Sequence, residues 1–395
     1  MVLAYCYRQL DIVMTLNHGT VTNLSSALDI ERLSRYCQGK TALVAQGGGQ
    51  RGIFTAGVLD AFMMSDFDPF DEFYGTSAGA VNLCAYLCRQ HTLGRRFLVD
   101  VTTHDEFFSL FGFLKRHRYL NLEWGFEQLT HFPMKLDLDL GRQVLGDRKA
   151  FAAVTCSNTL KDRYLPMLGP DWMSVLVATC AIPYLYRDSV PIGEHYYYDG
   201  GISAAIPVQQ AWRNNARLII TVRTEEEDTP LSDTLPSQAE FERKHQSDSG
   251  WAHQLDKWKA SWSDFLEEKL EQAHRERQKQ HHHLPLLNGG RWLFGAQDIY
   301  RLSHVFGDNF DSGLADMLLV HYQTYSLTQD FLNNPPDDCF VVQIKPHEPL
   351  LSTALMSAKE DLIHDYQLGL DAGYRFITDF LSAKNLVDSA SARYG

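Results

Sequence analysis

The sequence predicts an α/β fold built on a mainly parallel sheet, because two successive segments show the order strand, glycine turn, helix. Residues 41–45 form a short β-prone run that ends at glycines, and residues 53–64 then show the apolar spacing of a helix. The same order returns when residues 71–74 lead into a turn at Gly75 and residues 78–87 continue as a helix of small and apolar residues. Such repeated units place parallel strands in one sheet that helices cover.

Later segments extend this core. Further strands are expected at residues 151–157, 184–199 (with a loop), 218–223 and 340–344. Residues 353–381 have a helical pattern with two glycines inside it, so that one long helix or a broken pair would fit. We divide the chain into an N-terminal extension, an α/β core, a charged helical insertion or linker, and a mostly helical C-terminal α/β region that completes or flanks the core, at residues 1–40, 41–224, 225–290 and 291–395.

The length and net charge of the chain limit the kinds of domain and binding partner that it can have. A chain of 395 residues is long enough for two domains or for one large domain with an appendage. Its formal net charge of −13 disfavours non-specific binding to nucleic acid, because phosphate backbones are bound by clustered Lys and Arg. The same charge would repel an anionic lipid surface, so contact with a membrane would need local apolar or basic patches. The sequence does not indicate an oligomeric state.

The cysteines and the N-terminus indicate a cytoplasmic protein. The seven cysteines are scattered and form no C-x-x-C pair, which favours free thiols in a reducing compartment over a disulfide framework or a zinc site. Residues 1–15 lack the features of a secretion signal, and no window reaches the roughly 18 apolar residues that span a bilayer. We expect a cytoplasmic location, with peripheral contact to the inner membrane as an option.

A charged stretch at residues 251–283 has one apolar stripe at helical spacing, formed by Trp251, Leu255, Trp258, Trp262, Leu266 and Leu270. This pattern predicts a surface helix that lies on the core, with a membrane-docking helix as the less favoured alternative. The histidine tract at 281–283 is interpreted as exposed linker, because nothing nearby would fix the geometry of a metal site.

The strongest local motif is Gly-Thr-Ser-Ala-Gly, with Ser77 between Gly75 and Gly79. Glycines two positions before and after a serine allow a sharp turn from strand to helix, on which the hydroxyl projects at the amino end of the helix. The positive end of the helix dipole would stabilise an anion that develops there. Taken alone, the pentapeptide fits a nucleophile or an ordinary turn equally well.

The second motif, Gly-Gly-Gly-Gln-Arg-Gly at residues 47–52, also lies between strand and helix. Its Gly-x-Gly-x-x-Gly spacing would fit a dinucleotide-binding loop. However, the nearby Asp66, Asp68 and Asp71 lie in a proline-containing loop instead of ending a second strand, and a Walker A lysine is absent. The loop could instead direct backbone N–H groups at an oxyanion, with Arg51 holding the loop or the anion.

A nucleophilic serine needs a base. None of the sixteen histidines lies at an obvious strand end, and His195, His304 and His321 are interpreted as structural. Asp199, followed by Gly200 and Gly201, stands at a strand end after three tyrosines. An aspartate within hydrogen-bonding reach of the serine could take its proton directly and form a dyad.

Together these motifs resemble the three signatures of patatin-like phospholipases, in the order that the family has them. The resemblance covers approximately residues 41–224 and extends to the sequences at 57–59, 178–183 and 206–208. The Asp-Gly-Gly form resembles the bacterial members, although Gln46 stands where these often have an acidic residue. The C-terminal third resembles an extra region of some bacterial members.

The resemblance implies a three-layer α/β/α fold and hydrolysis of the acyl esters of glycerolipids, without a metal or an organic cofactor. Ser77 would attack the ester carbonyl, and Asp199 would act as the base. The oxyanion and substrate site would be formed by the loop residues Gly47, Gly48, Gly49, Arg51 and Gly52. A nucleotide-binding protein that uses the glycine loop and a non-catalytic module that binds lipid or protein remain the alternatives.

Overall fold

The computed structural model describes residues 30–109, 120–183, 185–186, 189–225 and 312–394. The strands in these ranges are β1 (Lys40–Ala45), β2 (Glu72–Thr76), β3 (Lys149–Cys156), β4 (Asp162–Pro166), β5 (Val190–Ile192), β6 (His195–Asp199), β7 (Ala216–Val222) and β8 (Phe340–Ile344). They form a single mixed sheet of order β5-β6-β3-β2-β1-β7-β8, with β4 also paired to β3. Five neighbouring strands run parallel to one another: β3, β2, β1, β7 and β8. The strands β4, β5 and β6 add antiparallel pairs at one edge.

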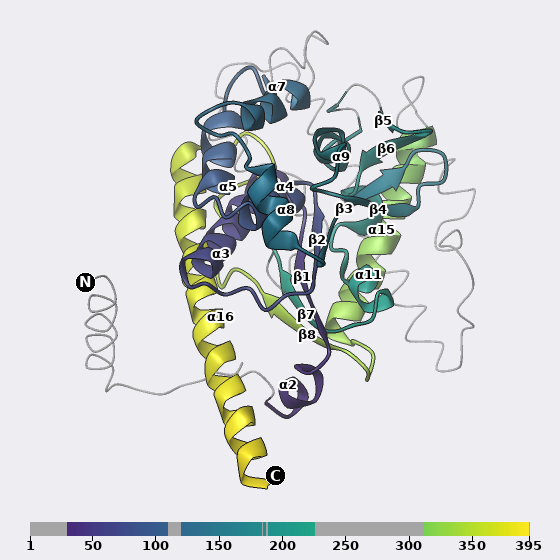
Figure 1. The fold of residues 1–395 in the computed structure, drawn as a ribbon. Helices are drawn as coiled ribbons and strands as arrows, with labels where there is room; N and C mark the ends of the chain where they lie inside the picture. The colour runs from purple at the N-terminus through teal and green to yellow at the C-terminus, as the bar shows by residue number, and fades with distance from the viewer. Residues whose placement is uncertain (1–29, 110–119, 184, 187–188, 226–311, 395) are drawn as a thin grey trace.

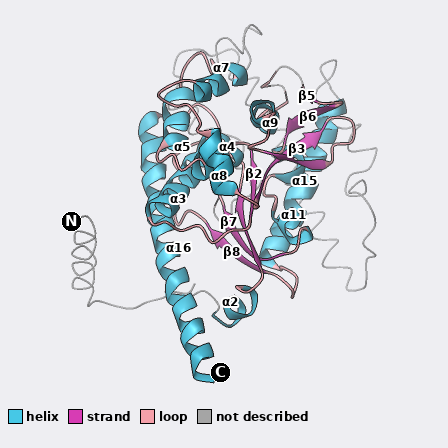
Figure 2. Ribbon diagram, in the orientation of Figure 1, coloured by secondary structure: helices cyan, strands magenta, loops and turns pink. Residues whose placement is uncertain are grey.

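The helices with the longest runs lie on the two faces of this sheet. The α-helices in the described ranges are α2 (Ile30–Tyr36), α3 (Gly52–Met64), α4 (Ala78–Leu87), α5 (Leu93–Arg96), α7 (Leu122–Glu127), α8 (Leu138–Leu145), α9 (Trp172–Thr179), α10 (Gly201–Ala204), α11 (Val208–Arg213), α15 (Ser312–Asn333) and α16 (Lys359–Tyr394). Short 3₁₀ turns occupy Gly49–Arg51 and Gln128–Thr130, and a π-helical turn occupies Phe97–Val101. Figure 1 shows α3 and α16 on one side of the sheet and α11 and α15 on the other, and the strands lie between them (Figure 2).

Alternate residues of the strands pack into two separate hydrophobic cores. Leu43 and Phe73 pack into a large core with the residues of α3, α4 and α16. Val44 and Tyr74, the next residue of each strand, pack into a smaller core with α11 and α15. Because successive side chains of a strand point to opposite faces, this alternation produces three layers. The predicted three-layer α/β/α fold with a mainly parallel sheet is therefore confirmed.

The C-terminal helix α16 packs directly on α3, the helix that follows the glycine loop. Only glycine fits at two points of this contact: a Cβ on Gly57 would lie 2.3 Å from the Tyr366 carbonyl oxygen, and a Cβ on Gly369 would lie 2.1 Å from that of Phe54. The buried carboxylate of Asp60 accepts a hydrogen bond from the Tyr366 hydroxyl at 2.7 Å. The glycines within residues 353–381 thus permit close packing instead of breaking the helix, and α16 is one continuous helix.

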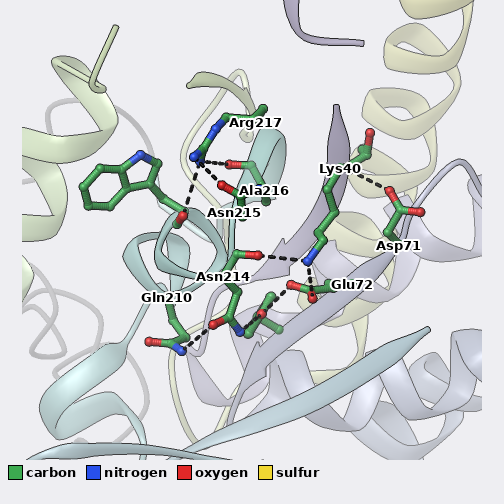
Figure 3. A network of polar contacts seen from close by, with 11 residues as sticks. Lys40, Asp71, Glu72, Gln210, Asn214, Asn215, Ala216 and Arg217 are labelled. Carbon is green, nitrogen blue, oxygen red and sulfur yellow. Dashed lines mark hydrogen bonds and ion pairs between the residues drawn. The ribbon is translucent and has the colours of Figure 1, made fainter. Parts of the chain in front are cut away.

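A polar network lies at the end of the sheet where β1, β2 and β7 begin (Figure 3). The Lys40 ammonium donates to Glu72 Oε1 at 3.0 Å and to the Asn214 carbonyl oxygen at 2.9 Å. The Tyr74 hydroxyl donates to the other Glu72 oxygen at 2.6 Å and accepts from the Asn214 side chain at 2.6 Å. Glu72 is therefore a buried charge with both oxygens paired, and the network stabilises the fold at this end of the sheet.

The predicted strands and helices of the core occur with small shifts at their ends. The edge strand β4 and its pairing with β3 had no sequence signal of their own. The predicted stripe at 251–283 and the histidine tract lie outside the described residues, and the four domain boundaries stay predictions. Within the described ranges, no helix has the length and apolar character that a bilayer-spanning segment needs.

Candidate active site

Ser77 lies in a strained turn between β2 and α4. Its φ of 50° and ψ of −125° place a non-glycine residue where L-residues are rare. The flanking glycines are required by close backbone contacts: a Cβ on Gly75 would lie 2.6 Å from the Ala80 nitrogen, and one on Gly79 would lie 2.4 Å from the Ala45 carbonyl oxygen. The sequence Gly-x-Ser-x-Gly therefore folds as the sharp elbow that the motif predicts.

The elbow is held from the α9 side. The Ser77 backbone N–H donates to Thr179 Oγ1 at 2.9 Å, and the Thr179 hydroxyl donates to the Ala153 carbonyl oxygen of β3 at 2.5 Å. The Ser77 hydroxyl donates to Cys180 Sγ at 3.7 Å. Burial raises the pKa of the Cys180 thiol far above its ordinary value, and Asp199 raises it further, so the thiol stays neutral. Thr179 and Cys180 were not predicted as site residues, although they lie in the stretch 178–183 that carries part of the resemblance.

Asp199 ends β6, and its carboxylate has one oxygen bonded and one free. Oδ1 accepts from the Gly201 backbone N–H at 2.5 Å, whereas Oδ2 is buried without a hydrogen-bond partner among the described residues. A Cβ on Gly200 would lie 2.2 Å from the Ala153 carbonyl oxygen, and one on Gly201 would lie 2.7 Å from Oδ1. Both glycines of the Asp-Gly-Gly element are thus needed to seat the carboxylate.

The electrostatic environment of Asp199 suits a base. Burial raises the pKa of Asp199 to about 7, against the opposing effects of the Gly201 N–H and of the nearby Ser77 side chain. The structure therefore brings Ser77 and Asp199, 122 residues apart in sequence, to one place. A carboxylate with a pKa near neutrality can both accept and return a proton in one reaction cycle.

The glycine loop presents two adjacent free N–H groups. The Gly47 N–H donates to the Ala205 carbonyl oxygen at 3.0 Å, and the Gly52 N–H bonds to carbonyl oxygens of the preceding turn. Within the described ranges, the N–H groups of Gly48 and Gly49 form no hydrogen bond. Of the predicted loop residues, these two have donors available for an anion, and the loop leads into the amino end of α3.

Arg51 is committed to an ion pair instead of being a free cation. Its guanidinium lies 3.2 Å from Glu225 Oε1, and both side chains are largely buried. The other oxygen of Glu225 accepts a hydrogen bond from the Tyr325 hydroxyl of α15. Arg51 therefore ties the glycine loop to the carboxyl end of β7 and to α15.

His321, also on α15, contacts the Asp-Gly-Gly element. Its Nδ1–H donates to the Gly201 carbonyl oxygen at 2.6 Å, and burial lowers the pKa of the imidazole. Thr324, one helical turn later, donates to the Ile202 carbonyl oxygen at 3.2 Å. No histidine is found among the described residues that hydrogen-bond to Ser77 or to the Asp199 carboxylate. Within those residues there is likewise no cluster of three or more groups that could hold a metal ion.

A mostly apolar cavity of about 50 Å³ adjoins Ser77 and Cys180. Its apolar wall includes Phe97, Leu98, Phe107, Leu122, Phe126 and Ile182. Two residues of the C-terminal region, Ala354 and Leu355, also line the cavity. It offers room for a few water molecules, so a long apolar chain would enter only if side chains moved.

Comparison with known proteins places two family models on the chain. Residues 43–212 match the model for patatin-like phospholipase, and residues 311–384 match a domain of unknown function (DUF6363). The first range includes the glycine loop, Ser77 and Asp199, and the second includes α15, β8 and most of α16.

A relative and a solved structure extend this comparison. The "Uncharacterized protein YjjU" of Escherichia coli (strain K12) is 31% identical over 340 residues, which cover 86% of this chain and 77% of that protein. The crystal structure of VipD from Legionella pneumophila aligns with a TM-score of 0.37 at 12% identity, over 87% of this chain and 67% of VipD.

Proposed function

Because the chain belongs to the patatin-like phospholipase family, we propose that it is a serine acyl hydrolase that cleaves fatty acyl esters of glycerolipids. The observation that carries the proposal is the strained elbow of Ser77 near a buried Asp199 carboxylate that has one oxygen free. A carboxylate that reaches the serine hydroxyl can act as the base without a histidine.

The first half of the proposed reaction forms an acyl-enzyme. The Ser77 hydroxyl gives its proton to Asp199 while its oxygen attacks the ester carbonyl carbon. The negative charge that forms on the carbonyl oxygen accepts hydrogen bonds from the N–H groups of Gly48 and Gly49. As the intermediate collapses, the carbon–oxygen bond to the alcohol breaks, and Asp199 gives its proton to the leaving alkoxide.

The second half releases the fatty acid. A water molecule gives a proton to Asp199 and attacks the acyl carbon, and the same two N–H groups stabilise the second anion. The bond to the Ser77 oxygen then breaks, and this oxygen takes the proton back from Asp199. Because Asp199 is alternately a base and an acid, its pKa near 7 supports both roles at neutral pH.

The cavity beside Ser77 supports an acyl chain over a nucleotide as ligand. Its lining is mostly aliphatic and aromatic, and Arg51 is already paired with Glu225. A nucleotide phosphate would instead need free positive charge at the loop. A cytoplasmic location and peripheral contact with a membrane belong to this proposal as well.

Labelling with a fluorophosphonate probe tests the proposed nucleophile. We expect covalent modification of wild-type protein at Ser77, and no modification of Ser77→Ala. Hydrolysis of a p-nitrophenyl acyl ester should be lost in Ser77→Ala and Asp199→Asn, with the far-ultraviolet circular dichroism unchanged. Full hydrolysis by Ser77→Ala would refute the proposal.

A further inference from the structure

The segment at residues 351–357, which precedes α16, contacts the glycine loop. We call it the C-terminal loop. The Ala354 carbonyl oxygen accepts a hydrogen bond from the Gln50 N–H at 2.9 Å. Gly49 has a φ of +58°, and a Cβ there would lie 2.2 Å from the same Ala354 oxygen. The two loops thus meet backbone to backbone beside the free N–H groups of the glycine loop.

The side chain of Gln50 joins the same two segments. It is 2% exposed, and its Oε1 accepts from the Ser357 N–H at 2.8 Å. Its Nε2 donates to the Thr102 hydroxyl at 3.0 Å and the Thr102 carbonyl oxygen at 3.3 Å. Every polar atom of this buried amide is therefore bonded, which fixes the distance between the glycine loop and the C-terminal loop.

The C-terminal loop is fixed from its other side by α16. The Asp365 carboxylate is fully buried and accepts from the backbone N–H groups of Leu351 at 3.1 Å and Ser352 at 2.7 Å. Within the loop, Thr353 N–H donates to the Ser357 hydroxyl at 2.9 Å. The backbone of the loop is thus held by the glycine loop, by α16 and by its own turn.

One of these side chains borders the cavity. Leu355 is half-buried and lines the cavity that also touches Ser77 and Phe126. The cavity is small, about 50 Å³, so the size of the Leu355 side chain affects how much space remains beside Ser77. A leucine on this anchored backbone, beside so small an apolar cavity, limits how much of an acyl chain can be buried.

We propose that Leu355, contributed by the domain of unknown function, is a specificity-determining residue that limits the length of the acyl chain beside Ser77. The proposal rests on the proposed acyl hydrolase function. The C-terminal domain would then be part of the active site instead of an appendage to it. Its helix α15 already contacts both the glycine loop, through Glu225, and the Asp-Gly-Gly element, through His321.

The test compares kcat/KM for p-nitrophenyl butyrate, octanoate and laurate in the full-length chain. Leu355→Ala enlarges the cavity by room for about two CH₂ groups, each worth roughly fourfold in binding, so the ratio of laurate to butyrate should rise about 16-fold. Leu355→Phe narrows the cavity and should lower the ratio. Leu351→Ala, in the same loop but 50% exposed and outside the cavity, is the matched control and should keep the wild-type ratio.

The two levels of the proposal fail in different ways. If wild-type protein neither hydrolyses the three esters nor reacts with the fluorophosphonate, the acyl hydrolase function is wrong and the role of Leu355 falls with it. If hydrolysis depends on Ser77 but the Leu355→Ala and Leu355→Phe profiles coincide with the wild-type profile, only the role of Leu355 is wrong. The labelling rate of Ser77 with a short-chain probe shows whether each variant retains its site.

Discussion

Replacement of Asp199 by Asn should make the protein more stable at neutral and alkaline pH while it removes activity. Burial raises the pKa of Asp199 from 3.8 to about 7, so the folded protein holds a proton there that the unfolded chain loses above pH 4. Because the folded state binds the extra proton between these two values, wild-type stability falls as pH rises from about 4 to 7. Above pH 7 the folded carboxylate is charged, and its cost is constant.

The size of the stability change follows from the shift in the pKa of Asp199. A difference of about 3 pKa units corresponds to about 4 kcal/mol of stability lost by pH 8. Asparagine keeps the oxygen that accepts from the Gly201 N–H, but its NH₂ group replaces the free Oδ2 and has no acceptor, which costs about 1–3 kcal/mol. We therefore expect Asp199→Asn to be more stable than wild type by about 1–3 kcal/mol at pH 8.

Urea unfolding of both proteins from pH 4.5 to pH 9 measures this difference. Its slope should be about 1.4 kcal/mol per pH unit at pH 5–6 and close to zero above pH 8. The pH dependence is the decisive signature, since a merely structural effect of the amide would shift all points equally. A stability difference that stays constant over the whole range would refute the raised pKa of Asp199.

Three further predictions concern the same site. If Asp199 is the base, kcat/KM for a p-nitrophenyl ester should fall about tenfold per pH unit below pH 7; a profile flat down to pH 5 would contradict this. Gly49 has a φ of +58° and lies against a backbone oxygen, so Gly49→Ala should lower the free energy of unfolding in urea by at least about 2 kcal/mol. Gly193, at φ +61° in open space, is the control, and Gly193→Ala should lower it by about 1 kcal/mol. Glu225→Gln weakens the largely buried pair with Arg51 and should lower kcat more than it changes KM, with a stability loss of about 1–3 kcal/mol; unchanged steady-state kinetics would show that the pair does not position the loop.

The motifs around Ser77 and Asp199 could be predicted from the sequence because glycines mark the close backbone contacts at both turns. A glycine two residues before and after Ser77 is required by backbone contacts of neighbouring elements, and Asp199 is seated by its own two following glycines. The strand and helix periodicities of the core were equally informative. Such patterns place Ser77 at the carboxyl end of β2, the edge at which parallel sheets bind ligands, and Asp199 at the end of β6, which runs antiparallel to β3.

The other contacts of the candidate site join segments far apart in the sequence, and no local sequence pattern predicts them. Gln50 bonds to Ser357, 307 residues away, and nothing in either segment specifies the other. Arg51 was expected to hold the loop or an anion, and its pairing with Glu225 became visible only from the fold. The predicted loop set also includes Gly47 and Gly52, whose N–H groups are used within the protein, a distinction that depends on where Ala205 lies.

The contact between Asp60 and Tyr366 also matters while the chain is being made. The two residues are 306 positions apart, so helix α3 leaves the ribosome long before the helix that covers it. At about 5–20 residues per second, this interval lasts roughly 15–60 s. During that time the apolar side chains of α3, such as Phe54 and Phe62, lack their final cover. We therefore expect this apolar face of α3 to stay exposed until α16 has been synthesised.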